Sequence, residues 1–172
     1  MFKQFIKKPI AKIVLVSSIL LSPNSIAAKA DFEQEIMIKS NRQSGDLKNK
    51  IISYLDDVKI TQGSLVIEAD LVQVLKKDDT DDDIYIAKGN PATFEQLLED
   101  GTPIKLQADE IIYEASSYTI TISGNALLSQ EGSEVRGSKI IYNTLTERLE
   151  AESYSNDTVT TILKPKAKDE QQ

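Results

Sequence analysis

The side chains of this sequence that could support chemistry are carboxylates, and the densest group of them runs from Asp78 to Asp83. Closely spaced aspartates offer the oxygen ligands that calcium prefers. However, the run lacks the central glycine and the closing glutamate of an EF-hand loop, and no helical pattern flanks it. The sequence therefore favours a solvated hairpin tip that has tolerated an insertion over a cation site.

A second pair of acids, Asp70 and Asp109, follows an alanine at equivalent places in a repeated phrase. Two carboxylates that converge in a cleft can hydrolyse a glycoside, but aspartates at chain reversals more often hydrogen-bond to the turn backbone. The chain has no histidine and no cysteine. This removes the commonest general base, the Ser-His-Asp triad, thiol nucleophiles and Cys-ligated metal sites. We therefore expect neither an enzyme nor a metal or cofactor site.

Residues 1–30 have the pattern of a secretory signal peptide. A lysine-rich start precedes the apolar run Ile13 to Leu21, which is shorter than the roughly 20 residues needed to span a bilayer. Ala28-Lys29-Ala30 supplies a cleavage site, so we expect export and removal of the segment before Asp31. The remaining chain has 15 basic and 27 acidic residues. A chain this acidic does not bind nucleic acid by neutralising phosphates.

The elements that would position any site are strands. In Gly63 to Val74, apolar residues alternate up to Ala69-Asp70, after which the alternation shifts by one residue. This pattern predicts a strand that bends at a corner. The phrase returns at Leu106 to Asp109 and at Val135 to Ser138, so one supersecondary unit is used repeatedly.

We predict an all-β domain over residues 31–165, with a dozen or more short antiparallel strands and a disordered tail at 166–172. Its fold class is an elongated, slightly twisted β-jelly roll of two antiparallel sheets with open terminal edge strands, which are Glu35 to Ser40 and Thr158 to Leu163. Ala92 to Leu98 fits a strand or a short helix, and we favour the strand. Three polar stretches are interpreted as turns: residues 41–49, 56–57 and 88–91.

Four stretches resemble the OstA-like β-jelly-roll family of periplasmic lipopolysaccharide-transport proteins. They are Val58 to Val74, Gly89 to Gln96, Ser123 to Gln130 and Thr158 to Pro165, and the likeness extends over the whole chain after residue 30. The resemblance implies a periplasmic protein that binds the lipid A acyl chains of lipopolysaccharide. It also implies a bridge between two partners, the periplasmic jelly-roll subunit of an inner-membrane export complex and the N-terminal jelly roll of an outer-membrane translocon.

The family's lipid-facing groove positions correspond to four apolar residues of this chain. A neighbouring position, usually a larger aliphatic, is Ala115 here. The alternative from another functional class is an exported scaffold or adhesion protein with a filled core, in which the same four residues are ordinary core. The open edges further predict a head-to-tail homo-oligomer, because the two ends differ and such a contact does not close into a ring. The lipid-binding residues implied by the resemblance are Ile36, Ile38, Phe94 and Tyr113.

Overall fold

The computed structural model describes residues 31, 33–76, 83–154 and 157–165. The predicted signal peptide, most of the acidic run and the predicted tail lie outside these residues. Within them the protein is almost entirely antiparallel β-structure. Its elements are β1 (Met37–Lys39), β2 (Arg42–Asp46), β3 (Ile51–Gln62), β4 (Leu65–Leu75), β5 (Ile84–Leu97), β6 (Pro103–Glu114), the single 3₁₀ turn η1 (Ala115–Ser117), β7 (Thr119–Gln130), β8 (Ser133–Asn143), β9 (Arg148–Glu152) and β10 (Thr160–Ile162).

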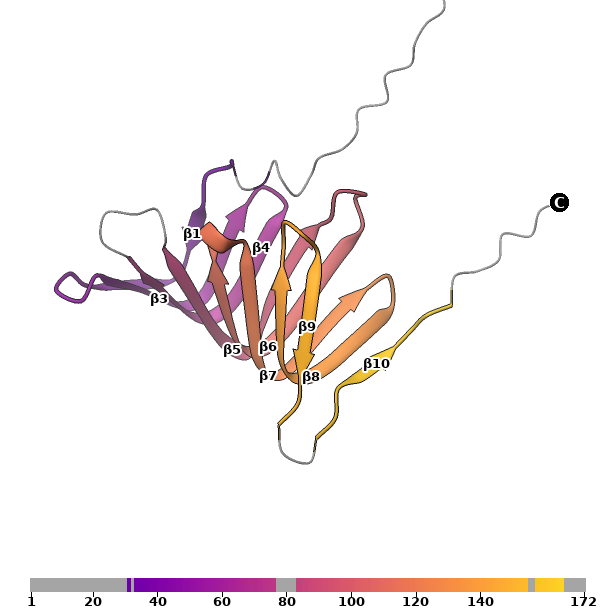
Figure 1. The fold of residues 1–172 in the computed structure, drawn as a ribbon. Coiled ribbons are helices and arrows are strands. Elements are labelled where there is room, and N and C mark those ends of the chain that lie inside the picture. Colours follow the sequence, from indigo (N-terminus) through magenta and orange to yellow (C-terminus); the bar gives the residue numbers. More distant parts are fainter. Residues whose placement is uncertain (1–30, 32, 77–82, 155–156, 166–172) are drawn as a thin grey trace, which may run out of the picture.

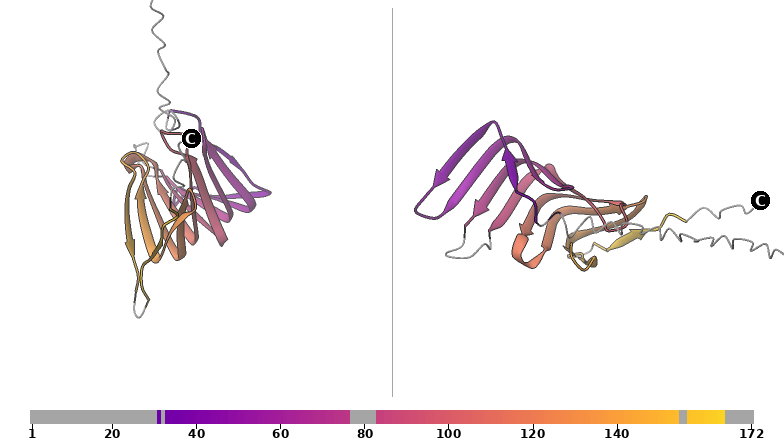
Figure 2. Two further views of the ribbon diagram at one scale, coloured as in Figure 1. Left: turned by 90° about the vertical axis from the view of Figure 1, so that its right-hand side faces the viewer. Right: turned by 90° about the horizontal axis from the view of Figure 1, so that it is seen from above.

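Strands β3 to β8 pair with their sequence neighbours, so the chain is a meander that advances along one axis. Each of these long strands is bent near its middle, where the pairing register shifts. The bends lie together along the lower edge in Figure 1, and two arms rise from them. The view from above in Figure 2 shows the strands side by side along the long axis, from indigo to yellow.

The bends divide the sheet into two halves that share every long strand. We call half A the segments 58–62, 65–69, 92–97, 103–108, 126–130 and 133–137, with β1 at one end and β10 at the other. Half B consists of the segments 51–55, 71–75, 84–88, 110–114, 119–123 and 139–143, with β2 and β9 at its ends. The two predicted sheets are therefore the two halves of one folded ladder, and the predicted fold class is confirmed.

The prediction of a dozen or more short strands was wrong, because two stretches interpreted as hairpin turns lie inside continuous strands. Asp56 and Asp57 form the bend of β3 and have positive φ values of 61° and 50°. Aspartate tolerates this left-handed conformation, which is why it also favours turns. Residues 88–91 form the bend of β5 without left-handed residues and include a cis Asn90–Pro91 peptide bond, and β5 continues through Leu97. The expectation of a strand at Ala92 to Leu98 is thereby confirmed.

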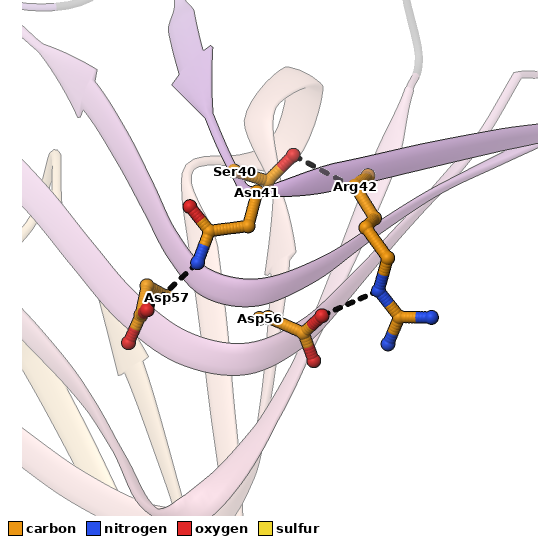
Figure 3. A network of polar contacts seen from close by, with 5 residues as sticks. All are labelled: Ser40, Asn41, Arg42, Asp56 and Asp57. Atoms are coloured by element: carbon orange, nitrogen blue, oxygen red, sulfur yellow. Dashed lines mark hydrogen bonds and ion pairs between the residues drawn. The ribbon is translucent and has the colours of Figure 1, made fainter.

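Residues 41–49, which we predicted to be a turn, contain a strand. β2 pairs with residues 51–55 of β3 and is exposed along its whole length, so it carries no apolar alternation. The chain crosses from β1 to β2 beside the bend of β3, where Arg42 pairs with Asp56 and Asn41 donates a hydrogen bond to Asp57 at 2.8 Å (Figure 3). The Arg42 guanidinium lowers the pKa of Asp56, chiefly through that hydrogen bond.

Small residues line the inner side of the bends, where the two halves converge. Ala92 and Ala108 are fully buried and lie opposite each other, and Ala126 lies opposite Gly137. A larger side chain would separate the halves at this point. The repeated phrase of a small residue followed by a polar one thus has a steric cause: the small side chain is inside the bend and the polar one is outside.

The edge strands are at opposite ends of the ladder, as predicted, but both are shorter than expected. β1 covers three residues of the predicted Glu35 to Ser40, and β10 covers three of Thr158 to Leu163. β10 is exposed throughout and pairs only with residues 134–136 of β8. Val159, Ile162 and Leu163 therefore leave large apolar side chains in solvent at this end.

Candidate functional site

The inner face of half A carries an apolar row that runs from one end of the molecule to the other. In an antiparallel ladder, residues directly opposite each other project from the same face. Following the register from β1 to β8 gives Ile38, Ile60, Ile67, Phe94, Leu106, Leu128 and Val135. Burial is complete in the middle of this row at Phe94 and partial at its ends, Ile38 and Val135.

The inner face of half B carries two such rows. The one nearer the bends passes through Tyr54, Val72, Ala87, Ile111, Ile122 and Ile140. The one further from the bends consists of Ile52, Val74, Tyr85, Tyr113, Ile120, Tyr142 and Leu149. The Tyr85 and Tyr113 rings lie with centroids 5.8 Å apart. Three tyrosines, two of them direct neighbours, thus lie among aliphatic residues in the part of half B that is remote from the bends.

The two halves face each other across one apolar interior. Their buried side chains form a single cluster, and a hydrogen bond joins the halves where Tyr113 Oη donates to Gln62 Oε1 at 3.3 Å. Desolvation in this interior raises the pKa of Tyr85 to about 12 and also raises the pKa values of Tyr113 and Tyr142. These phenols are neutral hydrogen-bonding groups at any physiological pH.

All four residues implied by the resemblance lie on this interior, but at different depths. Ile36 and Ile38 are half-buried at the β1 end, whereas Phe94 and Tyr113 are buried centrally in halves A and B respectively. Ala115 begins η1, directly after β6, and packs against the same cluster. The structure therefore brings the four residues to one interior, and their contact with a lipid stays a prediction.

Residue-by-residue inspection of the sequence missed the polar groups of this interior. Gln62 and Gln96 are only 6% and 2% exposed. Gln96 and Gln130 each lie opposite Ile104, so both project from the inner face. Their positions in the sequence could have revealed them, because each glutamine continues the alternation of inward residues in its strand.

The first residue after the predicted cleavage site also lies at this interior. Asp31 is 6% exposed, and its carboxylate accepts hydrogen bonds from the Ser64 backbone amide at 2.8 Å and from Gln96 Nε2 at 3.3 Å. Nearby, the backbone carbonyl of Gln34 accepts a hydrogen bond from Gln62 Nε2 at 3.2 Å. Asp31 and Gln34 therefore lie against the ends of β5 and β3, respectively, that are remote from the bends.

The candidate chemistry of the acids is not supported by their positions. Asp109 accepts hydrogen bonds at 3.0 and 3.2 Å from the side-chain amide of Asn125, which ties the bend of β6 to that of β7. This partner is a side chain, whereas a turn backbone was expected. Asp70 lies exposed at the bend of β4. Among the described residues there is no group of three or more potential metal ligands, and no helix among them is long and apolar enough to cross a membrane.

A surface hollow of about 660 Å³ lies outside the interior. Its walls include Asn125 and Arg136 at the bends of β7 and β8, together with Tyr154, which follows β9, and Thr160, the first residue of β10. It is lined by polar and apolar groups alike and does not reach the inward rows. The apolar interior, and not this hollow, is the candidate site.

Comparisons with known proteins agree on one family. Residues 37–148 match the family described as LptA/(LptD N-terminal domain) LPS transport protein. The lipopolysaccharide export system protein LptA of Haemophilus influenzae is 34% identical over 153 residues, which cover 88% of this chain and 89% of that protein. LptA of Escherichia coli K12 is 34% identical over 155 residues, covering 89% and 84%.

A solved structure gives the same result at the level of the fold. LptH of Pseudomonas aeruginosa, described as the LptA homologous periplasmic component of the conserved lipopolysaccharide transport device, superposes with a TM-score of 0.72. The two are 26% identical, and the match covers 79% of this chain and 99% of that one.

Proposed function

The chain belongs to the LptA/LptD N-terminal domain family of lipopolysaccharide transport proteins, and from this premise we propose that it binds lipopolysaccharide and carries it through the periplasm. In this proposal the acyl chains lie between the two halves and the sugar headgroup stays in solvent. The observation that carries the proposal is the set of inward apolar rows, which extend without interruption from the β1 end to the β8 end.

The energetics of such an interior suit transport. Each buried CH₂ group contributes about 0.8 kcal/mol, so several acyl chains supply enough binding energy to extract a lipid from water. Neighbouring positions in the half A row from Ile38 to Val135 are all aliphatic or phenyl, so a chain that advances along this row by one strand exchanges one apolar contact for a similar one. The interior therefore holds a lipid and also lets it move, and this requires no catalytic step.

Lipid entry requires the halves to separate. Phe94 and Ile60 are almost completely buried when the interior is filled by its own side chains. We infer that the halves open about their bends, which are the only covalent links between the two arms of each long strand. Ile36 and Ile38 would meet the acyl chains at the β1 end, and Phe94 and Tyr113 would meet them in the middle.

The edges support a bridging role. β1 and β10 lie at opposite ends of half A, and each has one side unpaired among the described residues. Addition of a strand from another jelly roll to β1 or β10 would continue half A, and with it the apolar row on its inner face. The proposed partners are a second copy joined head to tail, the periplasmic jelly-roll subunit of an inner-membrane export complex, and the N-terminal jelly roll of an outer-membrane translocon. Residues 31–165 would form the jelly-roll domain, with 1–30 as its cleaved export signal and 166–172 as its tail.

A second candidate function, an exported scaffold or adhesion protein without a lipid ligand, is favoured by one observation. The middle of the interior is closely filled, since Phe94, Leu106 and Ile122 have no exposed surface. Such a protein would keep the same strands and the same edges.

The decisive experiment is lipid binding by the full mature chain. Protein purified from the periplasm of a Gram-negative host should carry lipopolysaccharide that is detectable by mass spectrometry, and delipidated protein should bind fluorescent lipopolysaccharide saturably. A protein of the same purity that retains no lipid and gives no saturable signal would support the scaffold and contradict transport.

A further inference from the structure

The interior is not uniformly apolar, because three glutamines and three tyrosines occupy inward positions far from the bends. We call these residues the polar collar. Three come from half A and three from half B: Gln62, Gln96, Gln130, Tyr85, Tyr113 and Tyr142. The glutamines recur at intervals of 34 residues, once in each of β3, β5 and β7.

In a core without a ligand, the polar collar lowers the stability of the fold. Leu65 lies opposite Gln62, and Ile104 lies between Gln96 and Gln130, so an apolar side chain fits this level of the interior; on its other side Gln130 lies opposite Ser133. Within the described residues, Gln96 Oε1 and Tyr142 Oη are buried without a hydrogen-bond partner. A buried polar atom without a partner lowers stability, so these two atoms point to a ligand that satisfies them. Tyr142 Oη can donate to a carbonyl oxygen, whereas Gln96 Oε1 is an acceptor and needs a donor such as the N–H of an amide.

Two glutamine amides of the polar collar already donate hydrogen bonds to oxygen atoms of the protein itself. Gln96 Nε2 donates to a carboxylate oxygen of Asp31, and Gln62 Nε2 donates to the carbonyl oxygen of Gln34. Both acceptors belong to the segment that lies over the β1 end of the interior. The amide groups thus point to where an oxygen of an incoming molecule would lie.

The ligand chemistry follows from the depth of the collar. An acyl chain is apolar along its length and begins at an ester or amide carbonyl. Aliphatic rows lie nearer the bends, and the collar lies at the level where such chains would leave the interior. We propose that the polar collar binds the ester and amide groups at the roots of the acyl chains, donating to their carbonyl oxygens and accepting from amide N–H groups, and so fixes how deeply the lipid is inserted; this inference rests on the proposed function.

The charge state of the collar fits this role. Desolvation raises the pKa values of all three tyrosines, so their hydroxyls remain protonated donors. Neutral donors match a carbonyl, whereas a charged side chain would bind the phosphates of the headgroup instead. The collar therefore selects lipids that carry an ester or amide over pure hydrocarbons.

The test compares two ligands on matched variants of the full mature chain. The variants are Gln96→Met, Gln130→Met and Tyr142→Phe, which keep side-chain size and remove the polar group. The control is Gln107→Met, since Gln107 lies in half A on the outer face, opposite Thr93 and Leu127. The ligands are lipopolysaccharide and diphenylhexatriene, a fluorescent hydrocarbon that has no oxygen atom.

Each collar variant should bind lipopolysaccharide about three- to tenfold more weakly, as expected for one lost hydrogen bond. Diphenylhexatriene binding and the control variant should be unchanged. Wild-type affinity for lipopolysaccharide in all three collar variants would overturn the proposal, as would equal losses for both ligands. If Gln96→Met fails to fold, two variants still test the proposal: Gln130→Met, at a half-buried position, and the isosteric Tyr142→Phe. A wild-type protein that does not bind lipopolysaccharide would instead reject the proposed function itself.

Discussion

Replacing Ile38 with aspartate should remove lipopolysaccharide binding and leave the protein folded. Ile38 is half-buried on the three-residue edge strand β1. Full burial of an isoleucine side chain contributes about 1.5–3 kcal/mol, so its loss here should lower the free energy of unfolding by about 1 kcal/mol. A domain typically has about 5–15 kcal/mol in reserve. A carboxylate beside the acyl chains carries a desolvation penalty of several kcal/mol, and about 1.4 kcal/mol corresponds to a tenfold change in affinity.

We therefore expect at least a tenfold loss of affinity for fluorescent lipopolysaccharide, together with a small shift in the urea midpoint. Met37→Asp is the matched control, because Met37 is apolar, exposed and on the opposite face of the same strand. Equal binding by the wild type and both variants would refute the assignment of Ile38 to the lipid path. Equal weakening by both variants would show that the edge strand, and not its inner face, is being disrupted.

The equivalent change at Phe94 would not be informative. Phe94 has no exposed surface, and large-to-small substitution at such a position costs about 3–5 kcal/mol even before a charge is buried. Phe94→Asp should therefore unfold the protein. Phe94→Leu keeps the core filled and is the variant to use in binding measurements.

Four further outcomes are expected. Deleting residues 158–172 removes β10 and should convert concentration-dependent elongated oligomers into folded monomers that still bind lipid, which sedimentation velocity over a hundredfold concentration range would detect. Replacing Asp78 to Asp83 with Asn-Gly should change neither urea stability nor lipid binding, and a calcium-dependent melting temperature lost in this variant would contradict the hairpin-tip interpretation. Because burial raises the pKa of Tyr85 above its unfolded value of about 10, its contribution to stability is complete below pH 10 and should be lost as the pH rises towards 12; Tyr85→Phe should reduce that loss in melts between pH 9 and 12. Gly124→Ala should destabilise the fold by about 1–2 kcal/mol in urea, since Gly124 has a φ of 74° and an added Cβ would lie within 2.4 Å of the Asp109 carboxylate.

Much of the interior could be predicted from the alternation of apolar residues. Ile38 and Phe94 fall on the inward phase of their strands because one buried face imposes a period of two. The small residue of the repeated phrase marks the bends for a steric reason that is visible in sequence. These local patterns were sufficient for the fold class.

The predictions that failed concern residues that are common in two kinds of local structure. Asp56-Asp57 adopts left-handed backbone conformations at a bend, and the same residues in the same conformation would form a hairpin tip. β2 has no buried face, so it gives no periodic signal. Gln96 was overlooked because glutamine is usually a surface residue, and its role depends on which strands face one another, which no local pattern encodes.

The direction in which the strands are stacked has a mechanical consequence for the proposed bridge between membranes. Hydrogen bonds in an antiparallel sheet run perpendicular to the strands, so here they lie along the axis on which the strands are stacked. Tension applied along this axis would peel strands apart one at a time, and resistance would depend on the length of each pairing. The register joins β7 to β8 at ten residue pairs but β8 to β10 at only three. A stretched bridge should therefore yield at its terminal strands while the interior stays closed, and it can rejoin there without refolding.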